Sequence, residues 1–435
     1  MKNHYCRCRE ELWNDDDPPG EDVLVDLRQQ IEPWLASLIQ SEHFCLLLGS
    51  GLTTGVAHAL GTTAPGMPFE DLGTSLDENL RVAASNAATS TGRGAPNLED
   101  LLASARALSD GLSILADDRA DEVRNAYYAR LKKLLVDVLA AERSLANKLA
   151  GGHSGDTTGL YSLLLSAASR PPSQDRLEIF TTNYDRLIEH ACDQLGLRLV
   201  DRFIGSLTPR FRSSRLSVDM HYDPPGIRGE PRYLEGVVRH TKLHGSLDWR
   251  NRDGHVCRVA LPFGADDSHP EAVLQAHDDS DGLLIFPNPA KDVETTGYPY
   301  ADLHRDFSAS LCRPNTVAMT YGYGFGDEHL NRVIRDMLTL SSTHLVVVSF
   351  DDPGADADKL GRIGEFINSV GSPDQVTVLL GSHFGSLPVF ASQYMPRSLS
   401  ESLRRRESRI RVARGERQAS ESAEPPLGDS DANAT

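Results

Sequence analysis

Residues 44–55 of the chain read FCLLLGSGLTTG, and this stretch decides the predicted fold. Its first five residues are all apolar, which is typical of a strand in a parallel sheet that is covered on both faces. Gly49 and Gly51 follow at once and predict a tight turn into a helix. A buried strand that turns into a helix in this way is typical of the first unit of a doubly wound α/β domain.

Further strand patterns alternate with helical patterns along the chain. Residues 24–38 keep a helical period ahead of the first strand, and Tyr184 to Leu195 predicts a helix that ends at Gly196. Strand patterns follow at 177–182, 240–243, 283–286, 316–320, 345–350 and 376–380. This alternation predicts an α/β fold with a doubly wound, Rossmann-like and mainly parallel sheet.

An inserted helical module is predicted between the first two strands, at about 62–175. Residues 62–96 are rich in Gly, Ala, Thr and Ser and predict a long mobile loop or lid. Residues 97–149 keep a helical period, with Asn97 as a candidate cap. The predicted organisation is therefore an acidic segment and helix at 1–40, an α/β domain with this insertion at 41–400, and a disordered Arg-rich then acidic tail at 401–435.

The composition excludes several classes of protein. The 435 residues include 44 Lys and Arg against 62 Asp and Glu, a formal charge of −18, which argues against direct binding of nucleic acid through its phosphates. The six cysteines are scattered with no C-x-x-C pair, so no zinc or other metal site is expected. Without a signal peptide pattern or an apolar run of ~20 residues, we expect a cytoplasmic protein with no membrane span.

Polar residues and glycines follow five of the predicted strands. In parallel sheets ligands bind outside the carboxyl ends of the strands, so these segments would converge on one cleft. The segments are 49–55, 181–189, 242–249, 321–331 and 349–352. The glycine turn at the first could hold a pyrophosphate at a helix N-terminus, and His244 in the third is a residue type suited to proton transfer.

Each of these segments also has a purely structural interpretation. The first lacks the full G-x-G-x-x-G fingerprint, so its glycines could form only a turn. Thr182, Asn183 and Asp185 are all helix-capping residue types, and Asp327 is equally a candidate cap. His244 could be a structural histidine, and Ser349 to Asp352 could be a turn before a proline.

Three of the segments resemble the sirtuin motif series. Residues 49–53, 181–185 and 243–246 resemble G-A-G-x-S, T-x-N-x-D and H-G in that order. The wording TNYDRLIE at 182–189, KLHGSLDW at 242–249 and GYGFGDEHLN at 322–331 resembles the bacterial sirtuin-like branch associated with anti-phage defence, as does NLEDLL at 97–102. The four zinc cysteines of protein-deacylating sirtuins are missing, so the resemblance implies consumption of NAD itself, without zinc.

The resemblance implies an NAD hydrolase that releases nicotinamide and ADP-ribose. Asn183 would contact the nicotinamide-side ribose or the attacking water, His244 would act as the base, and Asp185 would support the local geometry. Gly49, Ser50, Gly51 and Thr53 would surround the pyrophosphate, Thr182, Gly322 and Tyr323 would also contact NAD, and Ser349 and Asp351 would meet the adenosine ribose.

The resemblance also implies a setting and partners. It points to an anti-phage effector that depletes NAD in abortive infection, forms a homo-oligomer and assembles with a HerA-like hexameric ATPase. Two alternatives stay open: a non-catalytic scaffold that binds NAD or ADP-ribose, and an NAD-dependent protein deacylase.

Overall fold

The computed structural model describes residues 2–64, 69–90, 96–150, 158–214, 218–223, 232–252, 254–266, 283–285, 298–352 and 360–396. The predicted tail at 401–435 and Phe286 lie outside these residues. Among the helices of these ranges, none combines the length and the apolar character that crossing a bilayer requires.

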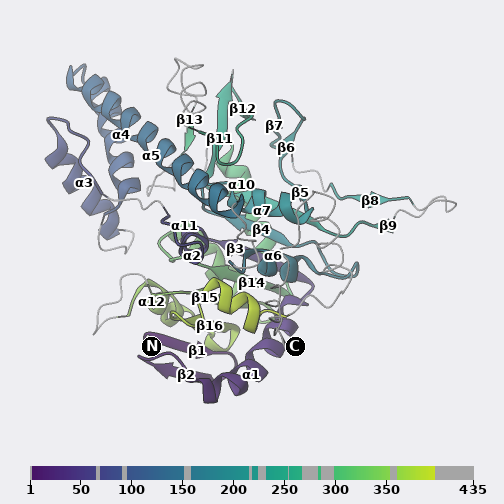
Figure 1. Cartoon of the computed structure of the whole chain (residues 1–435). Helices are drawn as coiled ribbons and strands as arrows, with labels where there is room; N and C mark the ends of the chain where they lie inside the picture. Colours follow the sequence, from purple (N-terminus) through teal and green to yellow (C-terminus); the bar gives the residue numbers. More distant parts are fainter. Residues whose placement is uncertain are drawn as a thin grey trace, which may run out of the picture.

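The core of the fold is one large, mainly parallel sheet (Figure 1). Its six central strands are parallel and lie in the order β16-β15-β14-β3-β4-β10. Their bounds are β3 (His43–Leu48), β4 (Glu178–Thr181), β10 (Val237–Lys242), β14 (Thr316–Tyr321), β15 (His344–Ser349) and β16 (Val376–Leu380). The predicted α/β, Rossmann-like architecture is confirmed, and the strand order reverses between β3 and β14, where such sheets bind their ligands.

Helices cover both faces of this sheet because alternate strand residues point to opposite sides. Phe44, Leu46 and Leu48 of β3 pack in one apolar cluster, and Cys45 and Leu47 pack in the other. The first face carries α1 (Glu21–Ile39), α2 (Ser50–Ala59), α6 (Leu160–Ala168) and α7 (Leu187–Leu195). The second carries α10 (Tyr300–Leu311), α11 (Glu328–Met337) and α12 (Arg362–Ser369).

A hairpin at the N-terminus extends the sheet beyond the prediction. β1 (His4–Arg7) pairs antiparallel with β16, and β2 (Glu11–Asp15) pairs antiparallel with β1. The sequence predicts only an acidic segment and a helix here. Strands of four and five residues with mixed polarity carry too few apolar positions for a period to show.

The predicted helical module exists, but its first part differs from the prediction. α4 (Leu98–Ile114) and α5 (Arg119–Ala150) confirm the helices at 97–149, and Asn97 forms a capping box with Asp100. The mobile loop predicted at 62–96 is wrong for α3 (Asp77–Ser90), which packs on α4. α3 buries Leu80, Ala84 and Ala88, a stripe four residues apart whose alanines are small enough to permit close packing.

A second, smaller sheet lies beside the carboxyl end of β10. Its strand order is β13-β11-β12-β7-β6. The bounds are β6 (Phe203–Ile204), β7 (Arg210–Phe211), β11 (Gly245–Arg252), β12 (His255–Arg258) and β13 (Leu283–Ile285). The strand predicted at 283–286 therefore pairs with β11 here and not in the main sheet. Three short strands complete the fold: β5 (Arg198–Val200) on the free edge of β10, and the pair β8 (His221–Tyr222) and β9 (Arg232–Tyr233).

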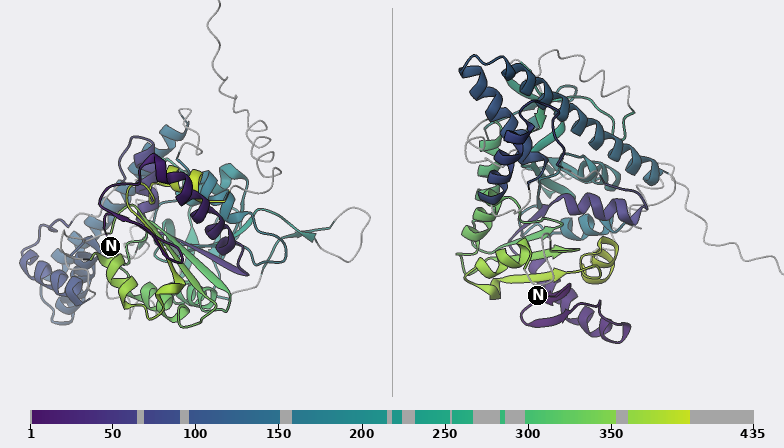
Figure 2. Two further views of the ribbon diagram at one scale, coloured as in Figure 1. Left: turned by 90° about the horizontal axis from the view of Figure 1, so that it is seen from below. Right: turned by 90° about the vertical axis from the view of Figure 1, so that its left-hand side faces the viewer.

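The module and the N-terminal hairpin mark opposite ends of the molecule. Both Figure 1 and the right-hand view of Figure 2 place α3, α4 and α5, in blue, at one end and β1, β2 and α1, in purple, at the other. The carboxyl ends of β4 and β10 lie toward the module, so the helices of the insertion can contact the segments that follow these strands.

Candidate functional site

The five predicted strand ends are adjacent and in register. Successive partners across the sheet form one row at the level of the carboxyl ends: Val348, Tyr321, Leu48, Thr181 and Lys242. Asn183 and His244 each come two residues after this row, on the neighbouring strands β4 and β10. The register thus brings the two predicted catalytic residues to the same edge of the sheet.

Three glycines join two turns at the point where the strand order reverses. The Gly51 amide donates to the Gly322 carbonyl at 3.0 Å, and Gly322 has a φ of +60°. A Cβ on Gly49 would lie 2.4 Å from the Gly322 carbonyl oxygen, and one on Gly51 would lie 2.5 Å from the Gly322 Cα. The glycines are therefore required for the close packing of these turns, whether or not a ligand is present.

The N-terminus of α2 is the candidate position for the pyrophosphate of a dinucleotide. Gly49 occupies the cap position, so no side chain caps the helix. Two amides of the first turn already have backbone partners, since Gly51 donates to the Gly322 carbonyl and Leu52 donates to the Gly49 carbonyl, each at 3.0 Å. Ser50, the first helical residue, is exposed, and the partial positive charge of a helix N-terminus favours an anionic group beside it.

Asn183 is anchored by its amide nitrogen. Its Nδ2 donates to the Gly49 carbonyl at 3.0 Å and to Thr53 Oγ1 at 3.2 Å, and the side chain is buried. Both amide hydrogens are used, and no hydrogen bond to Oδ1 occurs among the described residues. This geometry leaves Oδ1, an acceptor, as the atom of Asn183 that can meet a ligand.

Asp185 supports Asn183 indirectly. Thr53 donates to Asp185 Oδ2 at 2.7 Å, while Asp185 Oδ1 accepts the Leu187 amide at 3.1 Å and so caps α7. The helix predicted from Tyr184 therefore begins three residues later. Burial raises the pKa of the Asp185 carboxyl, although Lys242 acts in the opposite direction. Thr182 is half-buried, and its amide donates to the Leu48 carbonyl at 3.3 Å.

Lys242 and Glu189 form an ion pair beneath this segment. Their Nζ and Oε1 atoms are 3.1 Å apart, and Lys242 also donates to the backbone carbonyl of Asp185. Burial opposes the charge on Glu189, but Lys242, His240 and a backbone hydrogen bond together lower the pKa of Glu189 to about 2. The Glu189 carboxylate therefore stays ionised beside Lys242, and Lys242 fixes the backbone at Asp185.

His244 has a carboxylate partner that was not among the predicted site residues. Its Nε2 lies 2.9 Å from Asp327 Oδ2, and both side chains are buried. Asp327 occupies the cap position of α11, as predicted, but its side chain makes no capping hydrogen bond. Its position in a segment that follows β14 was the available signal, since that segment was expected to converge with the one that carries His244.

Tyr323 packs inside the fold. It is 4% exposed, and its hydroxyl lies 2.9 Å from Asn331 Oδ1 and 3.1 Å from the Asp327 carbonyl. Burial raises the pKa of this hydroxyl well above its usual range. This placement favours support of the turn that carries Asp327 over the predicted contact with NAD.

The segment after β15 contains a carboxylate with a structural role, next to the predicted Asp351. Asp352 accepts the amides of Ile363 at 2.8 Å and Gly364 at 3.1 Å and so caps α12. Ser349 is buried and Asp351 is exposed. A contact of Ser349 or Asp351 with an adenosine ribose stays a prediction.

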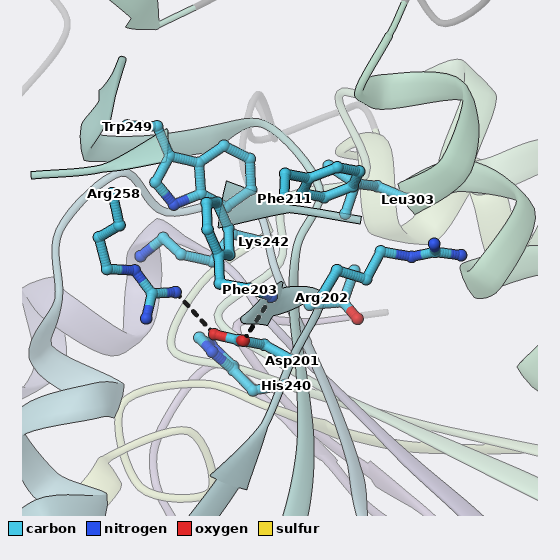
Figure 3. Close-up of a pocket in the computed structure, with 10 residues that line it drawn as sticks. Asp201, Arg202, Phe203, Phe211, His240, Lys242, Trp249, Arg258 and Leu303 are labelled. Atoms are coloured by element: carbon cyan, nitrogen blue, oxygen red, sulfur yellow. Dashed lines mark hydrogen bonds and ion pairs between the residues drawn. The ribbon is translucent and has the colours of Figure 1, made fainter. Parts of the chain in front are cut away.

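A separate pocket lies between β10 and the second sheet (Figure 3). It contains neither Asn183 nor His244. Its lining residues are Asp201, Arg202, Phe203, Phe211, His240, Thr241, Lys242, Trp249, Arg258 and Leu303. The cations among them already have partners: Arg258 pairs with Asp201, Lys242 with Glu189 and Arg202 with Asp306. The pocket therefore offers no unpaired cation to a phosphate, and the junction of β3, β4, β10 and β14 is the better candidate site.

Metal ligands are not gathered anywhere in the described ranges, since no group of three His, Cys, Asp or Glu side chains there could hold an ion.

A family model described as a SIR2-like domain matches residues 177–365. The match contains Asn183, His244 and Asp327 but begins after β3 and the glycine turn. It indicates an NAD-related activity and a likeness to sirtuin-type enzymes. A search of curated proteins found no match to the chain.

Proposed function

We propose that the chain hydrolyses NAD at the bond between nicotinamide and ribose, giving nicotinamide and ADP-ribose. The observation that carries the proposal is the placement of Asn183 and the His244–Asp327 pair on neighbouring strand ends, inside the segment that resembles a SIR2-like domain. The dinucleotide would lie across the point where the strand order reverses, with its pyrophosphate at the N-terminus of α2.

The residues of the site suit this reaction. The nicotinamide ring of NAD is a positively charged pyridinium. When its bond to the ribose carbon breaks, the ring nitrogen keeps the electron pair and neutral nicotinamide departs, so the departure needs little acid catalysis. A water molecule adds to the cationic ribose carbon and loses one proton. Asn183 Oδ1 would accept a hydrogen bond from that water or from a ribose hydroxyl and so orient it. His244 would take the proton.

Asp327 gives His244 the correct protonation state for a base. A carboxylate accepts only from a protonated nitrogen, so Nε2 carries the hydrogen and Nδ1 is the basic nitrogen. The negative charge of Asp327 also stabilises the imidazolium that forms. Asp327 would therefore act through His244 and would not touch the substrate.

The decisive experiment measures nicotinamide and ADP-ribose released from NAD by the purified chain, alone and with a HerA-like ATPase, ATP and DNA. Asn183→Ala and His244→Ala should each lower turnover by ~10²–10⁴. His383→Ala is the matched control, because His383 is half-buried and hydrogen-bonds Tyr394 at 2.8 Å outside the site. Intact NAD under all conditions would contradict the proposal, and ADP-ribose binding without nicotinamide release would favour the scaffold alternative.

The cellular role follows from the same proposal. Depletion of NAD in infected cells would make the chain an anti-phage effector, and a homo-oligomer assembled with a HerA-like ATPase would restrain it until infection. The support is the resemblance of its motifs to that branch. Cells that carry the wild type should lose NAD after infection while cells with Asn183→Ala keep it; equal NAD levels in both would contradict the role.

A further inference from the structure

The segment that carries Asn183 is held from two sides. Asn183 and Asp185 contact Thr53 of α2, as described above. The two alternate residues, Tyr184 and Arg186, contact the helical module instead. Residues 183 and 185 thus contact α2, and residues 184 and 186 contact the module. The module therefore helps to fix the four-residue segment that carries the side chain of Asn183.

The stronger of the two module contacts is a buried ion pair. Arg186 donates from its backbone amide to Glu142 Oε1 at 2.7 Å, and from Nη2 and Nε of its guanidinium to the two carboxylate oxygens at 2.6 and 3.2 Å. Glu142 lies in α5 and is fully buried. Backbone and side chain of Arg186 are thus both fixed to one carboxylate.

Tyr184 forms the second contact. Burial raises the pKa of its hydroxyl well above the usual range, and Glu99 in the first turn of α4 adds to this shift from nearby. Its ring belongs to the apolar cluster of the module, together with Leu98 and Leu131. The core of the module therefore continues without interruption into the candidate site.

The guanidinium of Arg186 also reaches the second sheet. It donates to the carbonyls of Leu261 and Pro262, which follow β12. A buried ion pair adds little net stability compared with apolar residues of similar volume, because both charges lose their hydration. Its geometry, in contrast, fixes the direction of every group that it touches.

We infer that the helical module is part of the active site, and that Arg186 and Glu142 are positioning residues that hold Asn183 in its reactive orientation. The effect on turnover rests on the proposed NAD hydrolysis. The position of the segment does not, and it can be measured by itself.

The test replaces the ion pair with apolar residues of similar volume, Glu142→Leu together with Arg186→Met. The matched control is Asp306→Leu with Arg202→Met, a second ion pair with side chains 10% and 9% exposed and an Nε–Oδ2 distance of 2.6 Å. We expect kcat for NAD to fall at least about tenfold in the first variant, since small displacements of catalytic groups are costly. The affinity for ADP-ribose should change less than about threefold, because the pyrophosphate is held by α2, and the control should keep its kcat. An unchanged kcat in the first variant, or an equal loss in the control, would overturn the inference.

Hydrogen exchange provides the second measurement. Amides of the peptide that spans residues 183–187 should exchange at least about tenfold faster in the first variant than in the wild type, and no faster in the control. If the wild type leaves NAD intact, the proposed function fails, and this exchange result alone decides the inference. Equal exchange in wild type and variant would then overturn it.

Discussion

The amino ends and the carboxyl ends of the central strands, here called the amino edge and the carboxyl edge of the sheet, both bury polar side chains. The hydrogen bonds of these side chains differ between the two. At the amino edge, Arg170 donates to the carbonyls of Ile39, Ser41, Glu42 and Asp175. At the carboxyl edge, Asn183, Thr53 and Asp185 bond mainly to one another, and Asn183 keeps an acceptor for a ligand. The first edge uses its polar groups to satisfy the backbone, while the second holds its polar groups in orientations that can serve chemistry.

A pair of histidines shows the same contrast. His244 at the carboxyl edge contacts the carboxylate of Asp327, which can stabilise an added proton. His344 at the amino edge lies with Nε2 2.8 Å from the hydroxyl oxygen of Thr377 and packs edge-on against Trp34. Burial lowers the pKa of His344 to about 4, so it stays neutral at physiological pH. The partner, more than the residue type, separates the two roles.

The largest effect should come from the partner of His244. Asp327→Asn keeps the shape but removes the charge and permits the wrong tautomer of the histidine, so we expect NAD turnover to fall by ~10²–10⁴. Asp336→Asn is the control, since Asp336 is exposed on the same helix. Turnover within about twofold of the wild type in Asp327→Asn would break the contrast between the two histidines.

Arg170→Met should produce the opposite pattern at the amino edge. Loss of its hydrogen bonds leaves several buried carbonyls unsatisfied, so the free energy of unfolding should fall by about 3 kcal/mol in denaturant titrations. The kcat of the folded protein should not change. Arg198→Met, at an exposed position, is the control for stability. A lower kcat with unaltered stability would show that this edge also serves the reaction.

Thr53→Val tests how the carboxyl edge orients Asn183. Valine has the shape of threonine but can neither accept from Asn183 Nδ2 nor donate to Asp185, so kcat should fall about tenfold. The buried groups left without this partner should lower the free energy of unfolding by about 1–3 kcal/mol. Thr54→Val is matched to it, because Thr54 is exposed on the same helix and hydrogen-bonds only its own turn at Ser50. If both variants keep the wild-type kcat, the hydroxyl of Thr53 does not orient Asn183.

The smallest expected effect is the pH dependence contributed by His344. Its pKa is about 4 in the folded protein and takes its ordinary value of 6.5 in the unfolded chain. Between these values only the unfolded chain binds the proton, so stability decreases as pH falls from 6.5 toward 4. His344→Gln should remove about 2 kcal/mol of the loss in unfolding free energy between pH 7 and pH 5. Parallel pH profiles for wild type and variant would contradict this role.

The sequence was sufficient for those parts of the fold that local pattern determines. Mainly apolar runs located β3, β4, β14, β15 and β16, because strands buried on both faces have few polar positions. β10 carries Arg239, His240 and Lys242, and the strand predicted at 240–243 covered only its last three residues. Local pattern was not sufficient for α3. Alanines form most of its buried stripe, so the composition of this segment resembled that of a loop. Local pattern also failed for the Tyr184–Arg186 segment, which stays outside α7 because Glu142 and Asp185 provide stronger partners than the helix would.

The candidate site was predictable by residue type but not by partnership. Strand ends and motif wording indicated Asn183 and His244, and the register places them at one edge. The roles of Asp327 and Glu142 became apparent only in the three-dimensional structure. Asp327 is 83 residues from His244 in the chain, and Glu142 is 44 residues from Arg186. The direction in which the Asp327 and Glu142 carboxylates point depends on the fold around them and cannot be predicted from the neighbouring residues in the sequence.

The hairpin at residues 4–15 has a consequence for the order in which the protein is made. β1 pairs with β16, so Tyr5 finds its partner Leu380 only after nearly the whole domain has been synthesised. Until then β16 does not exist, and afterwards it would be an open strand edge if the hairpin were missing. Residues that are synthesised well before β16 thus complete the sheet last, and they protect its final parallel strand from pairing with another chain.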